Sequence, residues 1–273
     1  MSIPSLPLND GYSIPQLGLG TYGLWNEEGA ATMAAAIEAG YRHLDTAARY
    51  ENEDAVGEAI RRASVPREEL FVTTKLDGEW QGNDLAVGGL RDSLARLGLD
   101  YVDLLLIHWP LPKRDEYVST WQTFERLRDE GLTRSIGVSN FKAAHLDRLA
   151  AETGTVPAVN QIQLNPTVAR LAERADHAAR GIVTESYSPF GGGGASVLRD
   201  PVIVAVAERI GRTPGQVVAR WHLQQGLVAI PKSGNLARLK ENLELDFDLS
   251  DQDLAEIATL NVEPGNDSDL GGH

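Results

Sequence analysis

Two successive units of one repeat occupy residues 85–139, which read LAVGGLRDSLARLGLDYVDLLLIHWPLPKRDEYVSTWQTFERLRDEGLTRSIGVS. In each unit, an amphipathic run of helix length (85–97, then 120–130) precedes a short apolar run rich in branched residues (101–109, then 134–139). Gly98 and Gly131 follow the two amphipathic runs directly, where glycine favours the end of a helix. The stretch therefore predicts two helix–strand units, which are typical of a parallel sheet covered by helices.

The same alternation extends to both ends of the chain. Strands are predicted at 17–21, 41–46, 70–76, 101–109, 134–139, 158–164, 183–187 and 227–231. Helices between them are predicted at 30–39, 54–63, 85–97, 120–130, 142–152, 171–180 and 216–224. Strands and helices in strict alternation predict an α/β fold of the (β/α)8 TIM-barrel type instead of an open doubly wound sheet.

Two further helices are predicted at 202–210 and 251–260. They do not fit the alternation of strands and helices and are predicted to be additions to the barrel. No Pro/Gly/Ser-rich linker and no low-complexity segment divides the chain. Residues 1–273 are therefore predicted to form a single domain. The Gly/Asp-rich tail at 264–273 is predicted to be flexible.

Composition and charge exclude several classes of partner. The 273 residues carry 25 basic and 39 acidic side chains, a net charge of −14, and no basic cluster, which argues against nucleic acid. No apolar run is long enough to span a bilayer, and the N-terminus lacks the pattern of a signal peptide. With no cysteine, disulfides and thiolate metal sites are excluded. We expect a cytoplasmic protein with neither nucleic acid nor membrane as its partner.

Polar side chains close three adjacent predicted strands. Asp45 closes the second strand with Tyr50 just after it, Lys75 closes the third, and His108 closes the fourth. Because active sites of barrel enzymes lie at the C-terminal ends of the strands, these four residues are predicted to meet. Any one of them taken alone is more often a turn former, a solvated charge or a structural histidine.

Together these four residue types are suited to protonating a carbonyl oxygen. A lysine ammonium next to a tyrosine stabilises the phenolate and lowers the tyrosine pKa, while a carboxylate keeps the lysine charged and oriented. A neighbouring histidine can hydrogen-bond the carbonyl oxygen. Such a set delivers a proton to an oxyanion as it forms, which carbonyl reduction requires.

Several stretches resemble the signatures of the aldo-keto reductases, in order along nearly the whole chain. They are GYRHLDTA (40–47), YENE (50–53), TTKL (73–76), DLLLIHWP (103–110), IGVSNF (136–141) and IPKS (230–233). Two more, GLTRSIGVSN (131–140) and VPAVNQI (156–162), are most similar to the bacterial 2,5-diketo-D-gluconate reductases. The resemblance implies an NADPH-dependent reductase of aldehydes and ketones, keto sugars included, acting as a monomer.

The resemblance also implies a role for individual residues. Tyr50 would be the general acid, Asp45 and Lys75 its activating pair, and His108 the residue that orients the carbonyl. The expected cofactor-binding residues are Thr21, Tyr22, Asp45, Ser139, Asn140, Gln161, Tyr187, Ser188, Lys232, Ser233, Arg238, Glu241 and Asn242. The expected substrate residues are Trp25, Tyr50, His108 and Trp109. Asn235 replaces a basic residue common in relatives, which predicts a weaker preference for NADPH over NADH.

The run GLGTYG at 18–23 matches the dinucleotide-binding pattern G-x-G-x-x-G, with Asp45 downstream. Its context argues against that interpretation, because Pro15 precedes it and the next helix is predicted to begin only at about Ala30. We interpret the run as the first barrel strand and its loop.

Other aromatic, glycine and histidine residues carry weaker signals. Trp80 is predicted to pack within a loop, because Asp77 occupies the place where relatives carry a tryptophan. Trp121 and Trp221 are predicted to pack between helices and sheet. The loop at 191–194 is either a flap over the pyrophosphate or an ordinary loop. The remaining histidines show no ligand spacing, and no metal is predicted.

Two other functions remain open at this point. One is a non-catalytic NADP(H)-binding regulatory or sensor subunit built on the same barrel, since a fold does not dictate a function. It would need a surface for its partner, and all four catalytic positions are intact, which favours the enzyme. The other is a barrel isomerase or aldolase, which would have no need of the cations Lys232 and Arg238.

Overall fold

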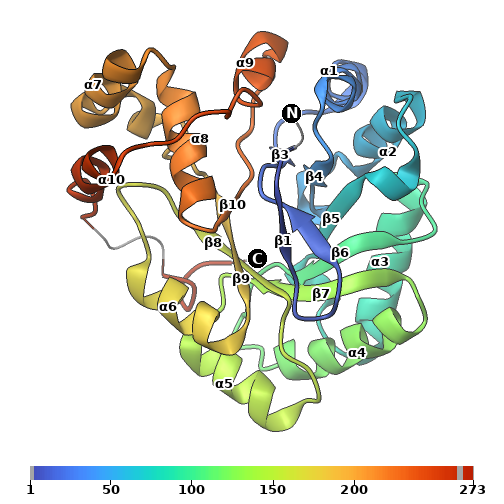
Figure 1. The fold of residues 1–273 in the computed structure, drawn as a ribbon. Coiled ribbons are helices and arrows are strands. Elements are labelled where there is room, and N and C mark those ends of the chain that lie inside the picture. The colour runs from blue at the N-terminus through green and yellow to red at the C-terminus, as the bar shows by residue number, and fades with distance from the viewer. Residues whose placement is uncertain (1–2, 263–266, 273) are drawn as a thin grey trace.

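The computed structural model describes residues 3–262 and 267–272. Its eight parallel strands are β3 (Leu19–Gly20), β4 (His43–Asp45), β5 (Phe71–Leu76), β6 (Val102–Ile107), β7 (Thr133–Ser139), β8 (Val159–Gln163), β9 (Val183–Tyr187) and β10 (Val228–Ala229). Each strand is hydrogen-bonded to its neighbours in chain order (Figure 1). A parallel bridge between Ala229 and Leu17 joins the last strand to the first, and the Gly18 N–H donates to the Ala229 carbonyl at 2.9 Å. The predicted (β/α)8 barrel is confirmed.

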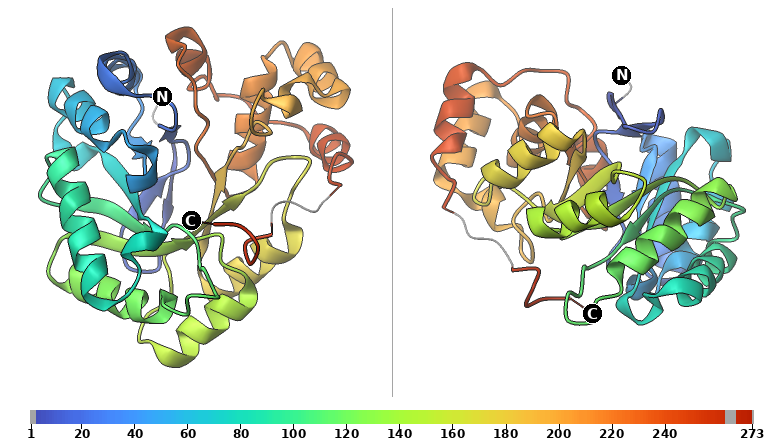
Figure 2. Two further views of the ribbon diagram at one scale, coloured as in Figure 1. Left: turned by 180° about the vertical axis from the view of Figure 1, so that it is seen from behind. Right: turned by 90° about the horizontal axis from the view of Figure 1, so that it is seen from below.

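The helices lie outside the strands in both views of Figure 2. Within the described residues they are α1 (Asn26–Ala39), α2 (Glu53–Arg62), α3 (Asn83–Leu97), α4 (Tyr117–Asp129), α5 (Ala143–Glu152), α6 (Leu171–Arg180), α7 (Pro201–Ile210), α8 (Pro214–Gln224), α9 (Leu236–Glu241) and α10 (Asp251–Ala258). Short 3₁₀ turns are η1 (Ala48–Tyr50), η2 (Arg67–Glu69), η3 (Gly78–Trp80) and η4 (Ser196–Arg199). Helices α7 and α10 are the two predicted additions. Helix α1 begins before the predicted residue 30, because Glu27 and Glu28 stabilise the positive end of its dipole.

An N-terminal hairpin that the sequence analysis missed closes one end of the barrel. Its strands β1 (Ser5–Pro7) and β2 (Ser13–Pro15) pair in antiparallel register around a turn at residues 8–12. Leu8 and Ile14 are buried in one cluster with Phe71 and Val228, which are the first residues of β5 and β10. The hairpin therefore covers the N-terminal ends of the strands and leaves the C-terminal ends for a site.

Side chains inside the barrel change from apolar to polar along the strands. Leu104 and Val159 pack with the hairpin in the apolar cluster. The interior also holds His43 at the start of β4, and Gln161 and Glu185 in the middle of β8 and β9, all of them at most 1% exposed. Gln161 donates hydrogen bonds to Glu185 and to Asp45, so a polar network leads from the interior to the C-terminal rim.

The described part of the tail, residues 267–272, contacts the loop after β7. Lys142 Nζ lies 2.5 Å from carboxylate oxygens of both Asp267 and Asp269. The rest of the tail predicted to be flexible, residues 264–266 and 273, lies outside the described residues. None of the helices in the described ranges has the length and apolar character needed to cross a bilayer.

Candidate active site

Asp45, Tyr50 and Lys75 meet at the C-terminal rim of the barrel, as their strand-end positions predict. Lys75 Nζ lies 2.6 Å from Asp45 Oδ1, 2.8 Å from the Thr46 carbonyl oxygen and 3.4 Å from the Tyr50 hydroxyl. Lys75 and Asp45 are each 1% exposed, so their attraction is little screened by solvent. The ammonium therefore joins the carboxylate to the phenol.

The electrostatics of this group have one feature that the sequence argument did not predict. Burial lowers the pKa of Lys75, but Asp45 and Tyr50 outweigh it and raise that pKa, so the ammonium stays charged. Burial also raises the pKa of Asp45, against the opposing effect of Lys75. Burial raises the pKa of Tyr50 above its ordinary value, and Lys75 offsets only part of the rise. Lys75 lowers the Tyr50 pKa as expected, but burial outweighs this effect, so Tyr50 stays protonated and ready to donate.

His108 lies on the other side of Tyr50, directly after β6. The two ring centroids are 6.0 Å apart, with the planes at 77°. The His108 carbonyl accepts a hydrogen bond from Asn140 Nδ2 at 3.2 Å, which ties the end of β6 to the end of β7. All four residues predicted to be catalytic are thus brought together by adjacent strands.

Asn52 fixes the loop that carries Tyr50, and the sequence analysis missed it. It is 1% exposed, and its Nδ2 donates to the carbonyls of Thr21 and Leu24 at 2.8 and 3.0 Å. Its Oδ1 accepts from the Thr46 hydroxyl at 2.8 Å. One amide therefore joins the loops after β3 and β4. Asn52 belongs to the YENE stretch (50–53), but the sequence does not show which carbonyls its amide contacts.

Four of the expected cofactor-binding residues, Ser139, Asn140, Gln161 and Tyr187, form one network across β7, β8 and β9. The Ser139 hydroxyl donates to the Gln161 carbonyl at 2.9 Å, and Asn140 Nδ2 donates to Ser139 Oγ at 3.0 Å. The Tyr187 hydroxyl donates to Asn140 Oδ1 at 2.9 Å. Asn140 and Ser188 have φ values of 63° and 52°, an uncommon conformation for residues other than glycine that often marks functional sites.

Of the two cations among the expected cofactor-binding residues, Lys232 lies beside the loop after β3 and Arg238 lies on α9. A Cβ built on Gly23 would lie 3.3 Å from Lys232 Nζ, so this ammonium sits next to that loop. Arg238 Nε lies 3.4 Å from Ser233 Oγ. Lys232 and Arg238 are exposed, and neither takes part in an ion pair among the described residues. Two exposed cations without acidic partners, in a chain of net charge −14, are suited to a phosphate.

The other expected cofactor residues are placed as follows. Thr21 is buried, and its hydroxyl donates to the Asp45 carbonyl at 3.0 Å. Glu241 is exposed at the end of α9, while Asn242 is 5% exposed and lies near Tyr41. The loop at 191–194 follows β9, and its Gly191 N–H donates to the Ser188 carbonyl at 3.0 Å. That contact joins the loop to the rim.

Aromatic side chains form a wall beside Tyr50. The Tyr22 ring lies 5.2 Å from the Tyr50 ring and 6.2 Å from the Trp25 ring, measured between centroids. Trp25 Nε1 donates to the Tyr50 carbonyl at 2.8 Å, and the rings of Trp109 and His108 are 6.5 Å apart. Tyr22 and Trp25 are 63% and 47% exposed, which suits a surface that a ligand covers.

Three other tryptophans pack as the sequence predicts. Trp80 lies against helix α3, where a Cβ on Gly89 would come within 2.9 Å of its side chain. Trp121 and Trp221 are buried at 0% and 4% exposure. The glycines at 18–23 belong to the first barrel strand and the loop after it, as predicted, and a Cβ on Gly20 would lie 2.7 Å from the Ile230 carbonyl oxygen.

His43, Asp45 and Glu185 bring one ligand atom each within 4.8 Å of one another, a cluster that sequence spacing did not reveal. Lys75 and Gln161 already donate to both oxygens of Asp45, and Gln161 donates to Glu185. A metal ion would have to displace the Lys75 ammonium from its carboxylate. The cluster is therefore better suited to holding the lysine than a metal.

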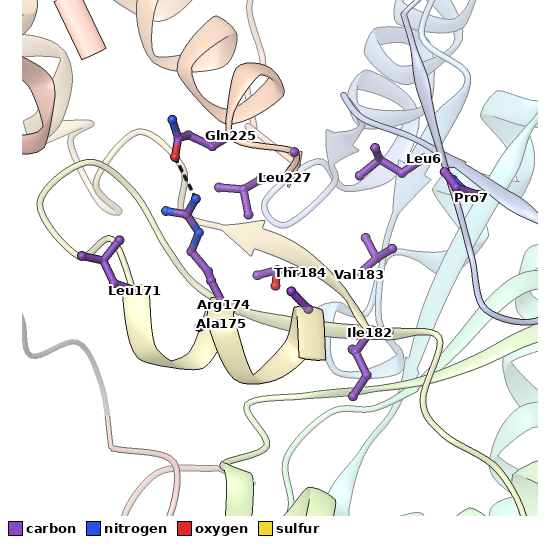
Figure 3. A pocket seen from close by; sticks show the side chains of 12 residues that line it. Leu6, Pro7, Leu171, Arg174, Ala175, Ile182, Val183, Thr184, Gln225 and Leu227 are labelled. Carbon is purple, nitrogen blue, oxygen red and sulfur yellow. Dashed lines mark hydrogen bonds between the residues drawn. The ribbon is translucent and has the colours of Figure 1, made fainter. Parts of the chain in front are cut away.

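A groove of about 480 Å³ lies far from these residues (Figure 3). Its lining includes Leu6, Pro7, Arg174, Val183 and Leu227, which belong to the hairpin, to α6 and to the N-terminal ends of β9 and β10. It therefore opens at the opposite end of the barrel from Tyr50 and Lys75.

Comparisons with known proteins agree with the barrel fold. The family model described as aldo/keto reductase family matches residues 16–262. An aldo-keto reductase of Mycolicibacterium smegmatis is 51% identical over 258 residues, which cover 94% of this chain and 93% of that protein. Methylglyoxal reductase DkgA of Escherichia coli K12 is 48% identical over 257 residues, 93% of this chain and 92% of that protein. A crystal structure of a Gox0644 variant in complex with NADPH superimposes with a TM-score of 0.94 at 40% identity and covers 100% of both chains. The chain belongs to the aldo/keto reductase family.

Proposed function

We propose that this protein reduces aldehyde and ketone carbonyls to alcohols with NADPH. The observation that carries the proposal is the Lys75 ammonium, held by Asp45 at 2.6 Å and lying 3.4 Å from the Tyr50 hydroxyl at the mouth of a barrel. Membership of the family supports the reaction class. The NADPH complex of Gox0644 supports the choice of cofactor.

The chain's own residues suit the two ends of this cofactor. Ser139, Asn140, Gln161 and Tyr187 offer polar and aromatic groups for the nicotinamide end, and Lys232 with Arg238 offers cations for the 2′-phosphate. Asn235 caps α9 by accepting from the Arg238 N–H at 3.1 Å and adds no charge there. We therefore expect a preference for NADPH over NADH that is real but smaller than a third cation would give.

Bound NADPH supplies a hydride to the carbonyl carbon. Tyr50 then gives its phenolic proton to the carbonyl oxygen, and solvent returns a proton to Tyr50 afterwards. Lys75 stabilises the phenolate left behind, Asp45 keeps Lys75 charged and in place, and His108 orients the carbonyl by a hydrogen bond. The product is the alcohol and NADP⁺.

The aromatic wall defines the class of substrate. Tyr22, Trp25 and Trp109 give an apolar surface next to the proton donor, suited to small carbonyl compounds with some apolar area. DkgA is named a methylglyoxal reductase, which makes small dicarbonyls and keto sugars reasonable first substrates. Asp77 accepts from the Gly78 N–H at 2.7 Å and occupies the position where relatives carry a tryptophan, so this part of the wall lacks an aromatic ring.

We propose that the enzyme works as a cytoplasmic monomer.

Titration with NADPH and NADH, followed by tryptophan fluorescence, tests the cofactor site. We expect tight binding of NADPH, weaker binding of NADH, and then NADPH-dependent reduction of methylglyoxal and of a panel of aldehydes and keto sugars. Absence of binding by either cofactor contradicts the proposal. Binding of NADPH without reduction of any carbonyl would favour the regulatory subunit instead.

A further inference from the structure

Glu185 is a buried carboxyl that the proposed reaction does not use. It lies in the middle of β9, is 0% exposed, and pairs in register with Gln161 of β8. Its Oε1 lies 3.6 Å from Nε2 of His43, and no described residue donates a hydrogen bond to that oxygen. Burying a carboxyl without a full set of hydrogen bonds lowers the stability of the fold, so a compensating role is expected for Glu185.

The hydrogen bonds of Gln161 indicate what this role is. Its Nε2 donates to Asp45 Oδ2 at 2.8 Å and to Glu185 Oε2 at 2.9 Å. A primary amide nitrogen has two hydrogens, so both are used. With Asp45 alone, one hydrogen would be left free and the amide could turn. Two acceptors, from β4 and β9, allow a single orientation, and only Oε1 of Gln161 remains available to a ligand.

We propose that Glu185 is a positioning residue of the cofactor site. Together with Asp45 it fixes the Gln161 amide, so that the Gln161 carbonyl oxygen accepts from the carboxamide NH₂ of the nicotinamide. The inference rests on the proposed function and adds a residue that contacts neither substrate nor cofactor. Because Asp45 also holds Lys75, the same network joins the proton-donor group to the nicotinamide end.

The charge of Glu185 adds a second effect. The titratable and charged groups that face it are His43 and Asp45 on β4, Lys75 on β5 and Tyr50 in η1. Burial and the charge of Asp45 raise the pKa of Glu185 to about 8, so it is mostly a neutral acid at pH 7. The nicotinamide ring is positive in NADP⁺ and neutral in NADPH. Loss of the Glu185 proton above pH 8 therefore favours the oxidised cofactor.

Cofactor binding by Glu185→Leu tests the positioning role. NADP⁺ contains the nicotinamide, whereas 2′,5′-ADP contains only the phosphorylated adenosine end. We expect Glu185→Leu to weaken NADP⁺ binding by about 5- to 20-fold, the effect of losing one oriented hydrogen bond, and to change 2′,5′-ADP binding by less than about twofold. Equal losses for both ligands, or no loss for either, would overturn the proposal.

Two further variants separate positioning from general damage. Glu53→Gln is the matched control, because Glu53 is equally buried but accepts from Thr74 Oγ1 and pairs with Arg96 outside the barrel interior. It should reduce thermal stability without changing the ratio of the two affinities. Glu185→Gln keeps an acceptor for Gln161 and should bind NADP⁺ within about twofold of the wild type at pH 7.

The pH dependence tests the charge of Glu185 in a variant that keeps the acceptor for Gln161. In the wild type, the affinity for NADP⁺ relative to NADPH should rise between pH 7 and 9, and in Glu185→Gln it should stay flat. An unchanged pH dependence in Glu185→Gln would overturn the electrostatic effect of Glu185, whereas a loss of NADP⁺ affinity in Glu185→Gln at pH 7 as large as the loss expected for Glu185→Leu would overturn the positioning role. Failure of the wild type to bind either cofactor would instead remove the proposed function, so the two failures are distinguishable.

Discussion

Tyr50 is the residue on which the proposed chemistry depends most directly. Its hydroxyl lies 3.4 Å from Lys75 Nζ, and burial keeps it protonated. Tyr50→Phe removes the proton and little else, so kcat should fall by about 10²- to 10⁴-fold, the usual contribution of a general acid. NADPH affinity, measured by fluorescence titration, should stay within a factor of about two as the control. Unchanged turnover would remove Tyr50 as the proton donor.

Lys75 and Asp45 form a buried pair whose partners are best tested together. Lys75→Met leaves Asp45 without its cation, and breaking such a pair costs roughly 3–5 kcal/mol of unfolding free energy. The double variant Lys75→Met with Asp45→Asn removes both charges and should recover part of that loss. Neither variant should regain activity, because nothing then stabilises the Tyr50 phenolate.

Urea denaturation and turnover measured on the wild type, Lys75→Met, Asp45→Asn and the double variant complete this cycle. A double variant no more stable than Lys75→Met would show that the pair is held by packing instead of charge. Recovery of turnover in the double variant would contradict the role given to the Lys75 ammonium.

At the scale of elements, the strand ends were predictable and the strand centres were not. Asp45, Lys75 and His108 are polar residues that close apolar runs, and parallel strands bring such positions to one rim. Glu185 and His43 lie within predicted strands, where alternation does not show which face points into the barrel. Their partners come from strands distant in sequence, so their network becomes visible only once the barrel is closed.

The N-terminal hairpin and the ends of the first and last barrel strands were also not predictable from local pattern. Strands β1 and β2 are three residues each, too short for alternation to be recognised, and the turn between them is the clearer signal. The ranges predicted for the first and last barrel strands are longer than β3 and β10, because their flanking residues form single bonds instead of a continuous ladder. Local pattern predicts the order of elements, whereas closure depends on contacts between the two ends of the chain.

Helices α2 and α3 approach each other at Gly57. A Cβ built on Gly57 would lie 2.1 Å from the Leu97 carbonyl oxygen, which is backbone and cannot turn away. Gly57→Ala should therefore lower the unfolding free energy by about 1–3 kcal/mol, the usual cost of overpacking. The matched control is Gly193→Ala, since a Cβ there would meet nothing within 4 Å. Urea denaturation measures both, and equal stability of the two variants would contradict the close helix contact.

At the scale of the whole molecule, the net charge is negative, whereas the expected cofactor site carries positive side chains. The chain carries a net charge of −14, yet the rim holds Lys75, the loop after β10 holds Lys232 and helix α9 holds Arg238. An anionic cofactor must approach through a repulsive field and is then held by local cations, so its association should be faster at higher ionic strength until the local pairs are screened. Independently of ionic strength, the buried histidines make the stability of the fold depend on pH.

Three histidines are buried in the neutral form, which makes the fold sensitive to acid. Burial lowers the pKa of His43 to about 3, and the pKa values of His177 and His222 to about 4. In the unfolded chain all three titrate near 6.5, so between that pH and 4 the unfolded state binds more protons. Stability is therefore lost as the pH falls below 6.5. Glu185 acts in the opposite direction, because its raised pKa makes the folded state bind the extra proton between about 4.5 and 8.

The effect of the three histidines outweighs that of Glu185. The free energy of unfolding should therefore fall by roughly 1–3 kcal/mol for each unit by which the pH is lowered between 6.5 and 5. Urea denaturation at half-unit intervals from pH 7.5 to 5 measures it. His222→Gln, which keeps a polar group near Ser186 Oγ, should reduce this slope by about 1 kcal/mol per pH unit, since one titrating group is gone. A flat profile in the wild type, or an unchanged slope in His222→Gln, would contradict burial of these rings in the neutral state. Because the histidines lie in β4, α6 and α8, the loss should appear as one cooperative transition of the whole barrel.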